Sequence, residues 1–413
     1  MEEYTLSADA QSLVLAFKHS EINSDEPKIQ VNRFVSELAS WYEKLRNAMD
    51  YREDEVVLRA AIERILKRRH LYGGTGSTIS EPLLRELVWA RYFPNDTLSE
   101  SMSKHVASII DLYLHLKKEI AKQNIMPEAK LNEWIYQFIS CHVARFLSPN
   151  QEKNIMGNFM FHIIKDAITI EDDSESTRNV QMYLGVRRAF ARDDLAFLRF
   201  YLFQQIYGEL TKENIDHVVT TFSKGYEEIN RQLNYPLKEK IFLYIRKQTP
   251  IFFILEDILR KNSTTLTELL KDKEEWKKIV FDACEVRYKS ISSRVRRAII
   301  RSVIFLLLTK VAFAYAIEGT YDRIFYGHLK WGSMIINVFI PPILMVVVSF
   351  FIRTPKQDNS ERILKRINTV LFSDNPRISH HLHLALNPKR KNSMNTVFGI
   401  LWFFAFIVSF GLL

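Results

Sequence analysis

The residues that could do chemistry are few and scattered. The two cysteines, Cys141 and Cys284, stand far apart, and neither has a second thiol at metal-ligand spacing. Both occur in apolar, helical surroundings, which favours buried, reduced thiols. His380, His381 and His383 lie close together, but no nearby carboxylate or cysteine completes a metal site. We therefore predict a solvated loop there, no metal site and no cofactor.

A glycine-rich segment, Gly73 to Ser77, could cradle a phosphate. It precedes a helix that we expect to begin near Glu81, and backbone amides at a helix N-terminus attract anions. However, the segment lacks the lysine of a P-loop, and no strand comes before it. A flexible connector is the favoured interpretation.

Two imidazole and carboxylate pairs occur at the helical spacing i, i+4. They are His162 with Asp166, and Asp111 with His115. A carboxylate-bridged metal site in a bundle needs Glu-x-x-His on two helices, and that pattern is absent. We interpret both pairs as ordinary polar helix faces, so the catalytic residues, if any, remain unknown.

Three apolar segments dominate the C-terminal part of the chain. Residues 298–317, 333–352 and 394–413 are each 20 residues long. A helix of this length spans a hydrocarbon core of about 30 Å. The second and third segments contain no charged residue. We predict that all three are transmembrane helices.

Two polar side chains fall inside these predicted spans. Lys310 lies 7 residues before Ile317, so its long side chain could snorkel to the interface. Alternatively, it lines a pore or pairs with an acidic lipid or partner. Asn337 precedes Pro341 and Pro342, which remove backbone donors and favour a kink in the second span. Helix packing explains that proline pair, and a gating or oligomer-contact role is the alternative.

The distribution of charge predicts an orientation in the membrane. The net charge is +9, and residues 298–413 hold 13 Lys and Arg against 5 Asp and Glu. Nucleic-acid binding is therefore disfavoured, because the excess does not belong to the N-terminal part. The positive-inside rule predicts a cytoplasmic N-terminus and a non-cytoplasmic C-terminus. The first residues also lack a signal-peptide pattern, so we expect the N-terminal domain to stay on the cytoplasmic side. We expect the protein to lie in the plasma (inner) membrane.

The basic loop at residues 353–393 contains an amphipathic segment from Ser360 to Phe372. Its apolar face and its basic residues predict a helix on the inner leaflet. The alternative is a helix packed on the soluble domain. The residues that would meet the membrane surface are Ile363, Ile367, Arg362, Lys365 and Arg366.

The pattern of residues 1–290 predicts a series of helices. Apolar residues recur at helical spacing, as in the stripes Phe34, Leu38 and Trp41, and Val57, Ala61 and Ile65. Prolines fall between the predicted helices or at their starts, and no run of alternating strand residues is convincing. We predict an all-α fold: a large irregular helical cytoplasmic domain, a bundle or array, followed by three transmembrane helices.

These features favour a membrane-anchored interaction or scaffold protein. Its expected partners are the lipid bilayer and either another protein or a second copy of the chain. A subunit of an oligomeric channel or transporter is one alternative, since intramembrane charge often marks a transport route. A membrane-tethered enzyme with an unrecognised site is another, because helical folds can hide sites from sequence inspection.

Overall fold

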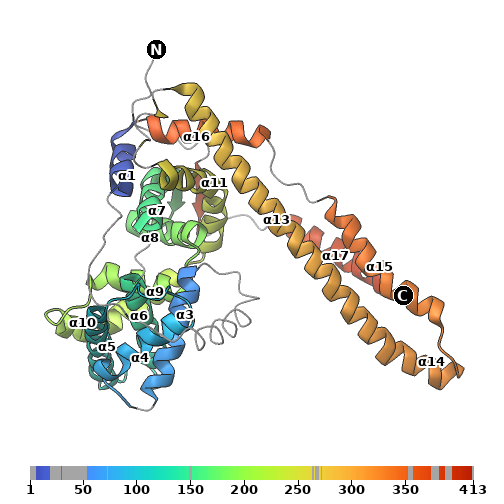
Figure 1. The fold of residues 1–413 in the computed structure, drawn as a ribbon, viewed down its shortest axis with the longest axis horizontal. Coiled ribbons are helices and arrows are strands. Elements are labelled where there is room, and N and C mark those ends of the chain that lie inside the picture. The colour runs from blue at the N-terminus through green and yellow to red at the C-terminus, as the bar shows by residue number, and fades with distance from the viewer. Residues whose placement is uncertain are drawn as a thin grey trace. The chain divides into compact units, whose positions relative to one another are not determined.

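In a computed structural model the protein is almost entirely helical (Figure 1). The structure describes residues 6–18, 29, 54–71, 73–147, 151–262, 265, 269–270, 272–351, 357–373, 381–386 and 393–411. The prediction of an all-α fold is confirmed. The predicted stripe that begins at Phe34 lies outside the described residues.

The chain forms two compact units. The first unit comprises Met1–Glu21 and Pro250–Pro376, and the second comprises Ile22–Thr249 and Arg377–Leu413. These units cut across the predicted cytoplasmic domain of residues 1–290. Helix α11 (Lys238–Asn262) contains the boundary between them.

Each unit has its own set of elements. Those of the first unit are α1 (Ala8–Lys18), α13 (Lys273–Phe313), the π-helical turn η3 (Ala314–Glu318), α14 (Gly319–Tyr326), α15 (Trp331–Ser349) and α16 (Gln357–Phe372). Those of the second unit are α3 (Asp54–His70), α4 (Gly76–Trp89), α5 (Glu100–Ala121), α6 (Glu128–Leu147), α7 (Gln151–Ile164), the 3-10 turn η1 (Lys165–Ala167), β1 (Ile168–Glu171), α8 (Glu175–Val186), the π-helical turn η2 (Arg187–Ala191), α9 (Leu195–Tyr207), α10 (Ile215–Leu233), β2 (Leu382–Ala385) and α17 (Ser393–Gly411).

The core of the second unit is the apolar interior of a helical bundle. Helices α3, α4, α5, α6, α9 and α10 lie together (Figure 1). They pack around one continuous cluster of buried side chains. Trp134, Phe138 and Phe203 belong to this cluster, with the two phenylalanine ring centroids 4.6 Å apart. Full burial of each such side chain contributes roughly 1.5–3 kcal/mol. This cluster explains why the very apolar helix α9 stays inside the protein.

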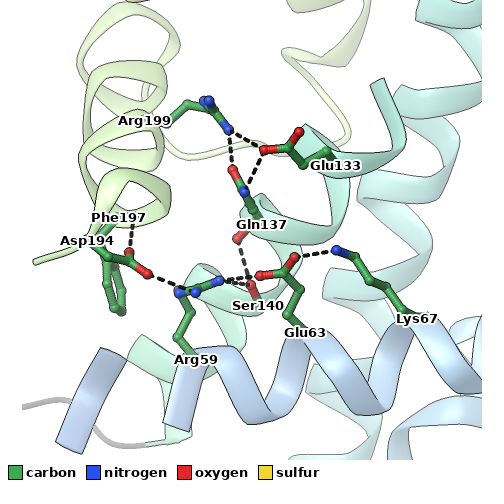
Figure 2. Close-up of polar contacts among 9 residues, drawn as sticks. All are labelled: Arg59, Glu63, Lys67, Glu133, Gln137, Ser140, Asp194, Phe197 and Arg199. Atoms are coloured by element: carbon green, nitrogen blue, oxygen red, sulfur yellow. Dashed lines mark hydrogen bonds and ion pairs between the residues drawn. The ribbon is translucent and has the colours of Figure 1, made fainter. Parts of the chain in front are cut away.

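A polar network also crosses this bundle (Figure 2). Arg59 of α3 is 6% exposed, and its Nη2 lies 2.8 Å from Oδ2 of Asp194, next to the start of α9. Arg59 also donates to Glu63, which accepts from Lys67 Nζ at 2.5 Å. Removing one partner of a buried ion pair costs about 3–5 kcal/mol, because the other charge stays buried. The network therefore fixes how α9 sits on α3.

A parallel two-stranded sheet joins distant parts of the second unit. Strand β1 pairs with β2, with Ile168 opposite Leu382 and Ile170 opposite Leu384. The sequence pattern did not predict this sheet, because each strand has only four residues, too few for their alternation to stand out. His383 lies on β2 and is exposed, and His381 comes directly before the strand.

Two prolines lie inside helices rather than between them. Helix α4 begins at Gly76 and continues through Pro82, whereas we expected a helix to begin near Glu81. Helix α11 continues through Pro250, where the sequence predicted a break. Pro250 cannot donate to the carbonyl of Arg246, and the hydroxyl of Thr249 donates to that oxygen instead, at 3.0 Å. This side-chain hydrogen bond lets the helix continue.

Candidate functional site

The candidate site is the part of the first unit that could enter a membrane. Helix α13, the turn η3 and α14 form one helical run from Lys273 to Tyr326, 54 residues long (Figure 1). Its start is capped by Asp272, whose carboxylate accepts from the backbone N–H of Glu274 at 2.9 Å. The predicted span of residues 298–317 lies within this run.

Burial changes sharply along α13. Near its start, Trp276, Val280 and Cys284 are fully buried. Further along, large apolar side chains face outward, and Phe305 is 70% exposed. Only 6% of the most apolar window is buried. Contiguous apolar surface on this scale marks an interaction with a membrane or another protein.

Helix α15 is the second apolar helix long enough to cross a bilayer. It has 19 residues, its most apolar 18-residue stretch has a mean hydropathy of 2.0, and it packs against α13. Met334 and Val338 of α15 are buried with Ala314 between the two helices. Gly327, at φ +71°, turns the chain between α14 and α15. The result is a helical hairpin with an apolar outer surface.

Among the described residues, two helices rather than three are long and apolar enough to span a membrane. The third predicted segment does form a helix, α17, and its described side chains, from Val397 to Val408, are apolar and exposed. Helix α17 has 19 residues, but its side chains are described only from Val397 to Val408, and that part alone is shorter than a bilayer requires. The described residues therefore support two spans.

The two polar residues predicted inside the spans differ in their surroundings. Asn337 of α15 donates from Nδ2 to Oε1 of Glu318, so a polar contact joins the two helices of the hairpin. Lys310 is partly buried on α13, and no described residue pairs with it. The structure therefore brings Asn337 into the hairpin contact, whereas the role of Lys310 stays a prediction. The prolines Pro341 and Pro342 lie within α15, which continues past them.

Helix α16 packs on protein through its apolar face. Ile363 and Ile367 are buried, and α16 contacts α13 and α1. The indole Nε1 of Trp276 donates to Oδ1 of Asn368 at 2.9 Å, and Ser7 N–H donates to Leu371 O at 2.8 Å. The apolar face predicted for the inner leaflet is therefore covered within the first unit, as in the alternative interpretation.

The basic side of α16 stays accessible. Arg362 and Lys365 are exposed, and Arg366 is half-buried. By helical spacing, Arg362 and Lys365 point away from the buried apolar residues, and Arg366 lies at the edge of the buried face. The role of these three residues at a membrane surface stays a prediction.

The other candidates have structural roles in the second unit. Gly76 is the first residue of α4, and its N–H donates to Oδ1 of Asp111 at 2.6 Å. The carboxylate of Asp111 thus occupies the place that a phosphate would take at this helix start. Asp166 pairs with Arg178 at 3.3 Å. Burial raises the pKa of the Cys141 thiol well above its usual range, so that thiol is a poor nucleophile.

No cluster of three or more metal-ligating side chains occurs among the described residues, and His380 lies outside them. No family model, curated protein or solved structure matches the chain. The structure of the site is therefore the evidence on function.

Proposed function

We propose that the protein is a membrane-anchored interaction protein, in which helical units are tethered to a bilayer by the hairpin of α13 and α15. The observation that carries this proposal is the helical run from Lys273 to Tyr326. Its first turns belong to a packed protein layer, and its later turns expose apolar side chains. One helix thus couples the folded unit to the membrane without a flexible linker.

The contacts at the base of α13 support a rigid coupling. Arg287 forms an ion pair with Asp257, with Nη2 and Oδ1 3.0 Å apart, and donates to the carbonyl of Phe253 at 3.1 Å. Tyr288 OH accepts from Asn359 at 3.0 Å and from Ser360 at 3.3 Å. Hydrogen bonds therefore join α13 to both α11 and α16. A partner that docks on this layer would be held at a fixed place on the membrane surface.

The proposal also covers the third span and the side of the membrane on which each part of the chain lies. Helix α17 is the third span, the N-terminal side and the basic loop at residues 353–393 face the cytoplasm, and the C-terminus faces away from it. The exposed residues Arg362 and Lys365 meet anionic headgroups, each contributing about 1 kcal/mol near the surface. The partner is another protein or a second copy of this chain, and nucleic acid is not a partner.

Extraction of membranes at alkaline pH tests the anchor. The intact chain should stay with the membrane pellet. The double change Phe305→Asp and Leu308→Asp places two charges on the exposed apolar part of α13. Each charge at the centre of a span costs about 2.5–3.5 kcal/mol, so a large fraction should move to the supernatant.

Val286→Asp is the matched control. Val286 is an exposed apolar residue on the same helix, but it lies before the apolar stretch. It should leave the chain in the pellet. Release of the intact chain at alkaline pH, or equal release of the two variants, would contradict the proposal.

A further inference from the structure

A groove in the second unit lies among α6, α7, α8 and α9. Its larger part has a volume of about 740 Å³ and its smaller part about 500 Å³. The two parts share four lining residues, so they adjoin: Arg145, Asn154, Asn158 and Gln204. These volumes match those of small-molecule sites, which span roughly 300–1,000 Å³.

The lining of the larger part is positive and otherwise neutral. It contains two arginines, Arg145 and Arg187, and no carboxylate. The remaining polar side chains are amides and hydroxyls, which offer neutral hydrogen-bond donors: Asn154, Asn158, Ser176, Asn179, Tyr183, Tyr201, Gln204 and Gln205. Such a lining favours an anionic group and disfavours a cation or a metal ion.

Arg187 is a fixed part of the groove wall. Its Nε lies 2.6 Å from the fully buried carboxylate of Asp193, which neutralises its charge. Its Nη1 donates to Asn154 Oδ1 at 2.7 Å, and its Nη2 donates to Tyr201 OH. The guanidinium carbon also lies 4.5 Å from the centroid of the Tyr201 ring. These bonds orient Asn154 and Tyr201, whereas Arg187 keeps little charge for a ligand.

Arg145 is the uncompensated cation of the groove. Its Nη1 donates to Gln204 Oε1 at 2.7 Å, and its guanidinium carbon lies 5.5 Å from the centroid of the Tyr201 ring. No carboxylate among the described residues pairs with it. An arginine has five N–H donors in a planar fork, so most of them are available to a ligand. Aromatic stacking and Gln204 hold the fork in place for bidentate contact.

The smaller part of the groove adds aromatic walls and one carboxylate. His105 stacks on Phe146 with ring centroids 4.2 Å apart. His142 lies 3.3 Å from Glu209, and burial lowers its pKa although Glu209 opposes that shift. A neutral His142 leaves Glu209 as the acidic group of the smaller part, whereas the lining of the larger part holds no carboxylate. The positive charge of the groove therefore sits at Arg145, beside planar side chains that suit an organic ligand.

We propose that this groove binds a small organic anion, with the phosphate or carboxylate of the ligand meeting Arg145. The amides of Asn158, Asn179 and Gln205 would donate to the remaining oxygens and hydroxyls of the ligand. This inference rests on the second unit alone, so it holds whether or not the anchor proposal does.

Calorimetric titration of the full chain in detergent micelles tests this site. The probes are adenosine monophosphate, citrate and adenosine. At least one of the two anions should bind saturably, and adenosine, which has no anionic group, should not. Arg145→Gln should lower the affinity for the anion about ten- to a hundredfold, as expected for the loss of a charge-assisted hydrogen bond. Arg145→Lys keeps the charge and should retain part of the affinity.

Arg231→Gln is the matched control, because Arg231 is an exposed arginine outside the groove that pairs with Glu228. It should leave the affinity unchanged. Dihexanoyl phosphatidic acid, a short-chain lipid, is the fourth probe. Tighter, Arg145-dependent binding of this lipid than of adenosine monophosphate would assign the anion to a lipid headgroup. The absence of saturable binding by all three anions, or equal binding by Arg145→Gln, would overturn the proposal.

Discussion

Asp194 shows how one side chain can serve both a helix and a buried network. Its Oδ1 accepts from Phe197 N–H at 3.1 Å at the start of α9, and its Oδ2 pairs with Arg59. Asn is as good an N-cap as Asp, so Asp194→Asn should remove the ion pair and keep the cap. Asp194→Ala removes both and should lower the free energy of unfolding by about a further 1 kcal/mol.

Chemical denaturation of both Asp194 variants measures that difference. Arg231→Gln, which affects a surface pair, should lie within about 0.5 kcal/mol of the wild type. Equal stability of the Asn and Ala variants would show that the cap contributes nothing.

Glu63 should make stability depend on pH in the acid range. Burial alone would raise the pKa of Glu63, but hydrogen bonds from Lys67 and Arg59 lower it below the ordinary value of 4.5. A lowered acid pKa stabilises the folded state above the ordinary pKa, and this stabilisation is lost as the pH falls through the folded value. At neutral pH, Glu63→Gln should therefore cost about 1–3 kcal/mol.

Denaturation of the wild type and Glu63→Gln across pH 7 to 3 checks this sign. Asp194, which faces the same arginine, remains in both proteins, so the comparison isolates the loss of the Glu63 carboxylate with the Asp194–Arg59 pair in place. The difference between the two proteins should shrink below the ordinary pKa of 4.5. A difference that grows as the pH falls would contradict the assignment.

Among the helices, α16 should contribute to stability through its buried apolar face. Ile367 is 1% exposed, on the face that packs within the first unit. Ile367→Ala should lower the free energy of unfolding by about 2–5 kcal/mol. Thr369→Ala, at an exposed position of the same helix, should change it by no more than about 0.5 kcal/mol. Thermal unfolding of the full chain in detergent measures both, and equal effects would show that α16 is not docked.

Long periodic helices were predictable from the sequence. Helices α5 and α6 lie in the region where the helical spacing of apolar residues predicted a series of helices. Each carries a long apolar stripe with turn or capping residues at its ends, so local signals agree with the packing. The two apolar helices of the hairpin, α13 and α15, were likewise predictable, because apolar length alone marks a possible span.

Features that depend on distant partners were not predictable. The sheet of β1 and β2 needs two four-residue strands far apart in sequence. The helix through Pro250 depends on one hydroxyl, that of Thr249. The groove at Arg145 has no spacing signature, because four helices contribute to it. The sequence of α16 predicted that its apolar face would be buried, but it did not indicate whether the membrane or the protein would cover that face.

For the molecule as a whole, we propose that α13 carries the chain into a membrane. Val286 is 55% exposed and Phe305 is 70% exposed, on the same helix. Water should reach both positions if no membrane is present. A bilayer should cover only Phe305, which lies in the apolar stretch.

Cysteine accessibility in membrane sheets open to solvent on both faces tests this anchor. Val286→Cys and Phe305→Cys are made separately in a chain whose Cys141 and Cys284 are changed to Ala. Each is treated with a membrane-impermeant maleimide, which reacts with a thiolate in water and, in open sheets, reaches the cytoplasmic side where position 286 is expected. We expect rapid labelling at position 286, and labelling at position 305 only after the membranes are dissolved and the chain is denatured. Equally rapid labelling at both positions in undissolved membranes would contradict the anchor.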